Sequence, residues 1–243
     1  KGRVYWRKAF EIPQASRQAK GKAIVNFLAL GQEETIASFL QVREFDDQHF
    51  VLMVTGGGVV KKTNLTAYSH PRTAGIQAIR LKDKDQLIDC KLTSGKNEVF
   101  LATEQGKAIR FSERLVRDMG RTASGVRGIR LGKKDQVIAA EIVEPKATAL
   151  TVTSQGFGKR SRFQDYRLTS RGGKGIKNTK VTAKNGYVVN VITVDDRDEI
   201  IIVTEGAMVV RIPVNQIRTV GRNTQGVRLI KLKSKDEVAS AMK

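Results

Sequence analysis

The chain has 243 residues, of which 44 are lysine or arginine and 24 are aspartate or glutamate, giving a net charge of +20. Self-repulsion at this charge is costly unless an anionic partner is bound, so we expect nucleic acid, with an anionic membrane surface as the alternative. No apolar run approaches 18 residues, which excludes a membrane-spanning helix. The basic residues are spread through the whole chain, which favours a long charged track over a single patch.

Cysteine and histidine are scarce. Cys90 is the only cysteine, so the chain can form neither an internal disulfide nor a cysteine-based metal cluster. His49 and His70 are the only histidines, and we interpret both as surface polar residues, so no metal site is expected. This cysteine usage is typical of a cytoplasmic protein.

In chain order, the sequence repeats itself about every 50 residues. Related segments, each ending in a basic residue seven positions after its threonine, contain Thr55, Thr103, Thr153 and Thr204. Such a period predicts one supersecondary unit copied several times within a single domain over 1–243. Its predicted parts are a partial first blade at 1–32, complete units near 34–85, 86–135, 136–186 and 187–236, and a closing strand at 237–242. The partial blade would contribute strands near 2–6 and 23–28, and pairing of the closing strand with these remains an open alternative.

The unit at 86–135 shows the elements clearly. Alternation of apolar and polar residues predicts strands at 87–92, 98–102, 107–111 and 126–131, with a tight turn between the second and third. Four strands per unit predict an all-β fold, a propeller-like pinwheel of about five to six four-stranded blades. A glycine precedes each fourth strand and predicts a turn that a side chain would block, at Gly75, Gly125, Gly175 and Gly226.

Catalytic motifs are missing from this pattern. The glycine-rich segments 56–58 and 171–175 are not nucleotide-binding loops, because a Walker loop needs Ser or Thr after its lysine and a helix beyond, whereas Lys174 is followed by glycine and a strand. Tyr68 and Tyr166 share a repeat position that is aliphatic in other units, which indicates packing. No set of nucleophile, acid and base converges, so we predict no catalytic residue, metal ligand or cofactor in this chain.

Basic residues recur at three repeat positions: the end of the return strand of each hairpin, the segment before the glycine turn, and the fourth strand. For any one residue, a solvated face or an ion pair with the neighbouring unit is an equal alternative, but three recurring series favour an anionic partner. Stacking aromatics are few, which favours duplex phosphates over single strands. The predicted DNA-binding residues are Arg17, Lys20, Lys61, Lys62, Arg72, Arg110, Arg121, Arg127, Arg130, Lys159, Arg160, Arg171, Lys174, Lys177, Arg211, Arg222 and Arg228.

Segments 120–131 and 220–227, together with 72–75 and 2–5, resemble the C-terminal domains of the DNA gyrase A family, and the resemblance covers essentially the whole chain. It implies a β-pinwheel, a ring whose blades exchange strands. It also implies that the basic rim wraps duplex DNA so that an ATP-dependent type II topoisomerase introduces negative supercoils. The implied partners are duplex DNA, the rest of the gyrase A polypeptide and the gyrase B polypeptide in an A2B2 assembly, with ATP and Mg²⁺ acting in the full enzyme.

The resemblance has two departures. The catalytic tyrosine of the family is expected in an N-terminal domain outside this chain, and its signature box, QRRGGKG, in a first-blade segment absent from it. A box-like loop stands at the homologous position of a later blade and consists of Ser170, Arg171, Gly172, Gly173, Lys174 and Gly175. The alternatives are the related domain of topoisomerase IV, an RNA-binding array and a non-catalytic protein-interaction propeller.

Overall fold

The fold is all-β, as the sequence predicts. The computed structural model describes residues 1–16, 18–31 and 34–243, and the only helices in these ranges are short 3₁₀ turns. The strands are β1 (Arg3–Val4), β2 (Phe50–Thr55), β3 (Val59–Asn64), β4 (Ile76–Gln77), β5 (Leu87–Thr93), β6 (Glu98–Thr103), β7 (Lys107–Ser112), β8 (Val126–Arg127), β9 (Val137–Ile142), β10 (Thr148–Thr153), β11 (Phe157–Arg162), β12 (Ile176–Lys177), β13 (Val188–Val194), β14 (Glu199–Thr204), β15 (Val209–Pro213), β16 (Val227–Arg228) and β17 (Val238–Met242). The 3₁₀ helices are η1 (Ala9–Glu11), η2 (Ile24–Asn26), η3 (Leu65–Tyr68), η4 (Glu113–Leu115), η5 (Phe163–Asp165) and η6 (Val214–Gln216).

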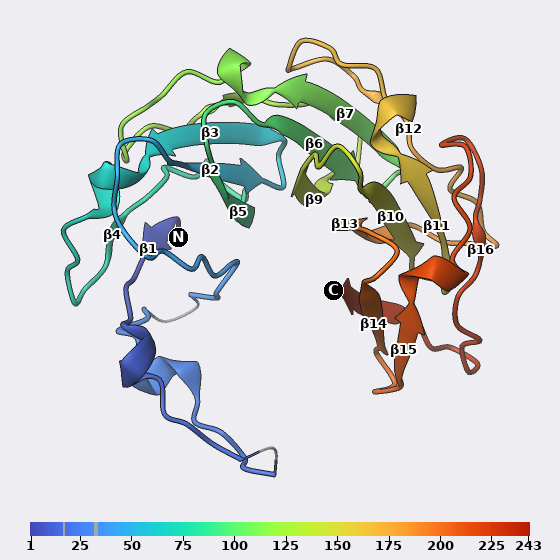
Figure 1. Ribbon diagram of the computed structural model, residues 1–243, viewed down its shortest axis with the longest axis horizontal. Helices are drawn as coiled ribbons and strands as arrows, with labels where there is room; N and C mark the ends of the chain where they lie inside the picture. The colour runs from blue at the N-terminus through green and yellow to red at the C-terminus, as the bar shows by residue number, and fades with distance from the viewer. Residues whose placement is uncertain (17, 32–33) are drawn as a thin grey trace.

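The sheets follow one another along an open arc (Figure 1). Three sheets have four strands, in the orders β5-β2-β3-β8, β9-β6-β7-β12 and β13-β10-β11-β16, and the last has the order β17-β14-β15. The first strand in each order lies on the inner, concave side of the arc, where β5, β9, β13 and β17 contact one another in succession. The strands at the other ends of the four-stranded orders, β8, β12 and β16, are therefore on the outside. The strand β4, which pairs with β1 in a two-stranded sheet, occupies the equivalent position one repeat earlier, and we call these four the outer strands.

Adjacent repeats exchange strands. The hairpin β2-β3 comes from the unit at 34–85, but both of its flanking strands, β5 and β8, come from the unit at 86–135. The same offset recurs for the hairpins β6-β7 and β10-β11. The exchange implied by the resemblance is confirmed, and the four strands of one sequence unit therefore belong to two sheets.

At the two ends of the domain, the structure decides one open alternative and contradicts one expectation. The strand at 237–242 does not close against the N-terminal strands, because β17 pairs with β14, with Ile202 opposite Ala241. Residues 23–28 form the 3₁₀ helix η2 in place of a strand, and its backbone bonds locally, from the N–H of Asn26 to the carbonyl of Ala23. The equivalent strands β4, β8, β12 and β16 each pair with a strand of the preceding repeat, and no such strand precedes η2 among the described residues. Among the described residues before Gly31, β1 alone forms a strand, and it pairs with β4.

The turn before each outer strand requires glycine. Gly125 has a φ of +91°, and a Cβ there would lie 2.6 Å from the carbonyl oxygen of Val60 on the neighbouring strand. The three equivalent glycines also have positive φ values and equally close neighbours. The predicted backbone turn is confirmed, and its reason is the close approach of the crossing chain to β3.

The cores lie between sheets. Leu52 and Val54 of β2 pack in one buried cluster with Val99 and Leu101 of β6. The next interface adds an aromatic group, in which Phe100 meets Tyr166 edge-on at 4.8 Å between ring centroids. Each sheet is therefore held by burial against its neighbours as well as by the exchanged strands.

Candidate nucleic-acid interface

The outer strands carry a row of exposed basic side chains. Along β8 and the residues after it, Ile129 is buried while Arg127 and Arg130 are exposed. The N–H groups of Gly128 and Ile129 both donate to the carbonyl of Gly58, so the regular alternation of faces is interrupted between the two arginines. We call the exposed basic residues of the four outer segments the outer track: Arg80, Arg127, Arg130, Lys177, Lys180, Arg228 and Lys231. With repeats about 50 residues apart, the fold thus places one or two cations on the outside of each sheet.

The loops before the outer strands tie neighbouring outer segments together. In the box-like loop, the N–H of Gly172 donates to the carbonyl of Gly128 at 2.6 Å, and the carbonyl of Gly173 accepts from the N–H of Arg130 at 2.8 Å. The Arg171 guanidinium donates to the carbonyls of Leu115 and Arg127 at 2.8 and 3.0 Å. The box-like loop therefore lies beside the outer track and is anchored to the preceding outer segment.

The other predicted loop residues differ in exposure. Arg72, Arg121 and Lys174 are exposed, whereas Arg222 is partly buried and donates to the carbonyl of Lys177 at 2.9 Å. Lys20 is exposed on the N-terminal segment. The prediction for Arg17 lies outside the described residues.

Five of the predicted DNA-binding residues are not on an exposed rim. Lys61, Lys62, Lys159 and Arg160 are buried and Arg110 is nearly so, which corrects the expectation that the ends of the return strands face solvent. Their places in the fold explain this. Lys62, Arg110 and Arg160 end the return strands against the 3₁₀ helix of the next sheet, whose carbonyls need donors. Lys61 and Lys159 instead donate to carbonyls of the outer segments and of the loops before them. We leave these five out of the candidate interface.

Arg110 shows the contact in full. Its guanidinium pairs with Glu98 at 2.6 Å and donates to the carbonyls of Phe163 and Tyr166, on the next sheet, at 2.9 and 3.2 Å. Arg211 occupies the same repeat position in the last sheet, where no further sheet is described, and it is exposed with only the Glu199 ion pair. The recurring cation is therefore an inter-sheet clasp wherever a following sheet exists.

Two further series of basic residues were not predicted from the sequence, although they recur with the same period of about 50 residues. One follows the 3₁₀ helices and is exposed: Arg117, Arg167 and Arg218. The other lies in the loops that lead from the outer segments to the inner strands, where three lysines have left-handed backbone: Lys84, Lys134 and Lys235, with φ values of 63°, 55° and 65°. Both series add positive charge on either side of the outer track.

A hollow beside β16 gathers several of these cations. Its wall includes Phe157, and the Lys184 ammonium and the Arg228 guanidinium lie 5.7 and 5.4 Å from the centre of that ring. Lys231, Lys233, Lys235 and the acidic Asp236 and Glu237 complete its lining, with Gln155, Ser234 and two aliphatic residues. Five basic and two acidic side chains line this hollow, so it is a basic recess.

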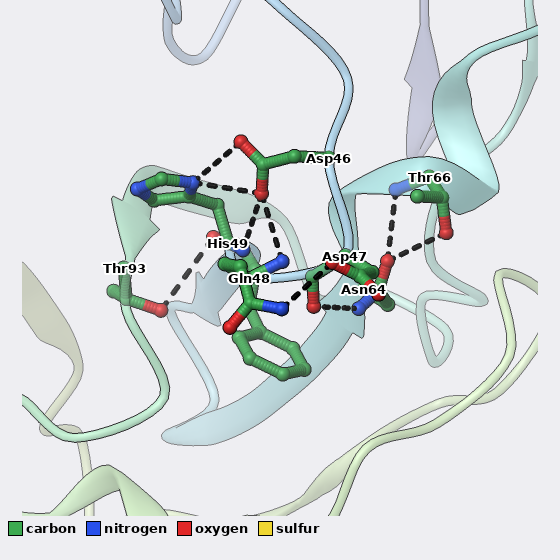
Figure 2. A network of polar contacts seen from close by, with 8 residues as sticks. Asp46, Asp47, Gln48, His49, Asn64, Thr66 and Thr93 are labelled. Carbon is green, nitrogen blue, oxygen red and sulfur yellow. Dashed lines mark hydrogen bonds and ion pairs between the residues drawn. The ribbon is translucent and has the colours of Figure 1, made fainter.

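The histidines and tyrosines have structural partners. Figure 2 shows the His49 ring facing the Asp46 carboxylate, with its Nδ1 2.7 Å from Oδ2. The hydrogen bond from His49 lowers the pKa of Asp46, and Asn64 closes the same loop by donating to the carbonyl of Asp47. Tyr68 and Tyr166 are buried, as a packing role predicts.

Neither metal-binding clusters nor membrane-spanning helices occur in the ranges that the structure describes. No group of three or more His, Cys, Asp or Glu side chains there is arranged to hold a metal ion. No helix in the same ranges is long and apolar enough to cross a bilayer.

Comparisons with known proteins agree with this architecture. The family model described as "DNA gyrase C-terminal domain, beta-propeller" matches residues 1–43, 49–94, 97–144, 148–195 and 198–243. The DNA gyrase A polypeptide of Buchnera aphidicola subsp. Acyrthosiphon pisum is 52% identical over 243 residues, which is 100% of this chain and 29% of that protein. The DNA gyrase A polypeptide of Salmonella typhimurium is 46% identical over 98% of this chain and 27% of its own length. This chain thus spans just over a quarter of these relatives.

Solved structures are similar as well. The crystal structure of the C-terminal domain of DNA topoisomerase IV matches with a TM-score of 0.91 and 27% identity, covering 100% of this chain and 76% of that one. A DNA gyrase A C-terminal domain matches with a TM-score of 0.86 and 26% identity, covering 99% and 78%. The fold alone does not separate the two, whereas the sequence relatives and the family model favour gyrase.

Proposed function

This chain belongs to the family of DNA gyrase C-terminal domains, and on that basis we propose that it binds duplex DNA along the outer track and bends it around the arc. The observation that carries the proposal is the repetition of exposed cations on successive outer strands, which gives a curved row of phosphate contacts. The box-like loop and the basic hollow beside β16 flank this row and extend it. Arginine and lysine contacts to phosphate position a duplex without reading its sequence.

The cost of bending the duplex and the gain from phosphate contacts are of similar size. A duplex carries one charge per ~1.7 Å of axis, so a long basic track meets many phosphates at once. Bending about 40 base pairs through half a circle costs on the order of 10 kcal/mol for a persistence length of about 50 nm. Ten or so phosphate contacts at roughly 1 kcal/mol each offset that cost. We therefore expect binding that weakens steeply with salt and depends little on base sequence.

In the whole protein, the bent DNA would be presented to a breakage and reunion centre. We propose that the complete enzyme is a cytoplasmic ATP-hydrolysing type IIA topoisomerase of A2B2 composition, that ATP and Mg²⁺ act in its other domains, and that this domain adds negative supercoils by wrapping. This domain would itself supply no catalytic residue. The names of the full-length relatives support the assignment to gyrase A.

A second candidate is the equivalent domain of topoisomerase IV, which the TM-score of 0.91 favours. In that case the domain would bind DNA and select substrates without chiral wrapping. The two functions differ in what they do to DNA topology, so one experiment separates them.

The test is a change in linking number. The chain is incubated with nicked circular DNA, the nick is ligated, the protein is stripped, and the linking number is counted against protein added. A shift that grows with protein supports wrapping, and salt-sensitive binding without a shift supports the topoisomerase IV function. A variant in which Arg127, Arg130, Lys177 and Arg228 are all alanine is the control, and it should lose the shift while it stays folded. Absence of duplex binding at low salt would overturn the proposal.

A further inference from the structure

Two fully buried lysines lie on return strands of alternate sheets. The side chains of Lys61 on β3 and Lys159 on β11 are 0% and 1% exposed. In the intervening and last sheets the same repeat position holds Ile109 and Val210. Since an aliphatic residue fills this position elsewhere, packing alone does not require a lysine.

The ammonium groups bind backbone carbonyls of the loops before the outer strands. Nζ of Lys159 donates to the carbonyls of Asn178, Gly221 and Arg222 at 2.7, 3.1 and 2.5 Å, and to Oγ of Ser161 at 3.2 Å. The acceptors come from two segments that are far apart in the chain, the end of one outer strand and the loop that leads to the next. Lys159 therefore joins two neighbouring outer segments from their buried side.

Lys61 makes the equivalent contacts two sheets away. Its Nζ donates to the carbonyl of Arg121 at 2.7 Å and to that of Ala78. Arg121 and Ala78 occupy the same repeat positions as Arg222 and Asn178. In both sheets one acceptor is the backbone of an arginine that the sequence places in the DNA-binding set. The loop between them along the arc, at 170–175, has no lysine beneath it, since Ile109 occupies the position.

A buried ammonium is costly unless hydrogen bonds replace its water shell. Here the replacing acceptors are almost all backbone oxygens, and no carboxylate of the described residues pairs with either Nζ. The free energy of burial is therefore offset only while the loop carbonyls stay in place around the ammonium. This coupling makes the lysine sensitive to loop position in a way that isoleucine would not be.

We propose that Lys61 and Lys159 are positioning residues that fix the loops at 120–125 and 221–226 and so hold Arg121 and Arg222 at the DNA-contacting surface. The proposal rests on the DNA-binding function proposed above. On this proposal, a buried lysine anchors the loops at 120–125 and 221–226. The loop between them along the arc, at 170–175, is held by the Arg171 side chain and the Gly172 backbone instead.

The anchors also respond to pH. Burial lowers the pKa of Lys159 to about 7 and that of Lys61 to about 8. Around Lys159, the charge of Asp165 raises the pKa of the lysine and the charge of Arg222 lowers it. Around Lys61, Asp118 raises the pKa and Arg121 lowers it. Deprotonation removes one N–H donor and the charge, so the anchored loops should loosen as the pH rises from 7 to 9.

The test compares Lys159→Ile with the unchanged chain, because isoleucine is the residue that the chain itself uses at this position. Hydrogen exchange at 221–226 should accelerate about tenfold or more, while exchange at 170–175 stays the same. Affinity for a 40-base-pair duplex should fall about fivefold at constant salt, the size expected for one displaced phosphate contact. The affinity of the unchanged chain should decline between pH 7 and 9. That of the variant should decline less, because Lys61 still titrates in this range, and that of a variant with both Lys61→Ile and Lys159→Ile should stay constant.

Lys61→Ile provides the second arm, with faster exchange expected at 120–125 only. Lys159→Met serves if the isoleucine variant fails to fold, because methionine adapts to an irregular site. Unchanged loop exchange and an unchanged pH profile in folded variants would overturn the proposal. Failure of the unchanged chain to bind duplex DNA would instead contradict the proposed function. The exchange data would still show whether the lysines anchor the loops.

Discussion

Arg160 and Arg127 have equal standing in the sequence, and the structure gives them different roles. Arg127 is exposed on β8, whereas the Arg160 side chain is 9% exposed and reaches across to the next sheet. The substitution Arg160→Met keeps the apolar stem and removes only the guanidinium. We expect it to lower the stability of the domain without lowering the number of phosphate contacts.

The magnitude follows from the contacts that the substitution removes. The Arg160 Nε donates to the carbonyl of Ile217 at 2.7 Å, and a buried hydrogen bond from a charged donor contributes about 1.5–3 kcal/mol. The partner Asp196 is 75% exposed, so that ion pair adds at most about 1 kcal/mol. The free energy of unfolding should fall by about 2–4 kcal/mol, which for a chain of this length lowers the thermal midpoint by roughly 5–12 °C.

Two measurements on the same proteins check this. Thermal unfolding should separate Arg160→Met from the unchanged chain, while Arg127→Ala and the exposed neighbour Arg162→Ala should have unchanged midpoints. The slope of log affinity for duplex DNA against log salt should fall by about one for Arg127→Ala and stay constant for Arg160→Met. An unchanged midpoint together with a reduced salt slope for Arg160→Met would refute the clasp.

Three further substitutions test local features of the fold. Gly125→Ala should lower the free energy of unfolding by about 2–4 kcal/mol, because the added Cβ would lie 2.6 Å from the Val60 carbonyl and the residue has a φ of +91°. Gly120→Ala is the control: its Cβ would have nothing within 4 Å, so thermal unfolding should show little change. Ala207→Gly should stabilise by about 0.5–1 kcal/mol, since alanine there has a φ of 61°, and a lower midpoint would contradict this. Tyr166→Phe should cost about 1–2 kcal/mol in denaturant unfolding and more than Tyr68→Phe, because their hydroxyl bonds measure 2.5 and 3.4 Å; equal losses would count against the argument.

The strands and turns were predictable because their signals are local. Alternating apolar residues and the glycine at the hairpin turn depend only on neighbours in the chain, so the hairpin at 98–112 and the positive φ of Gly125 follow from the sequence. The partner of each outer strand is not a local property. A unit with four strands fits one sheet or two equally well, and the resemblance rather than the spacing favoured exchange.

The interface was predictable only in part. Periodicity shows that Lys62, Arg110 and Arg160 recur, but a recurring cation satisfies a carbonyl of the next sheet as readily as a phosphate. The sequence predicts Lys61 and Lys159 on the rim because charge usually means exposure, and burial among backbone oxygens is invisible in the sequence. The clue that was available is Ile109, since an aliphatic residue at the same repeat position indicates a buried site.

Strand exchange also sets an order of events while the chain is being synthesised. The hairpin β2-β3 is complete at Asn64, but its outer strand arrives only with Val126 and Arg127, about sixty residues later. A chain growing from its N-terminus therefore always carries an unfinished sheet at its newest end, with unpaired N–H and C=O groups along both sides of the last hairpin. Each new repeat seals the previous sheet and leaves its own sheet open. Nascent chains stalled between the end of a hairpin and the arrival of its outer strand, such as those stalled between 64 and 126, should accordingly be prone to pair with foreign strands.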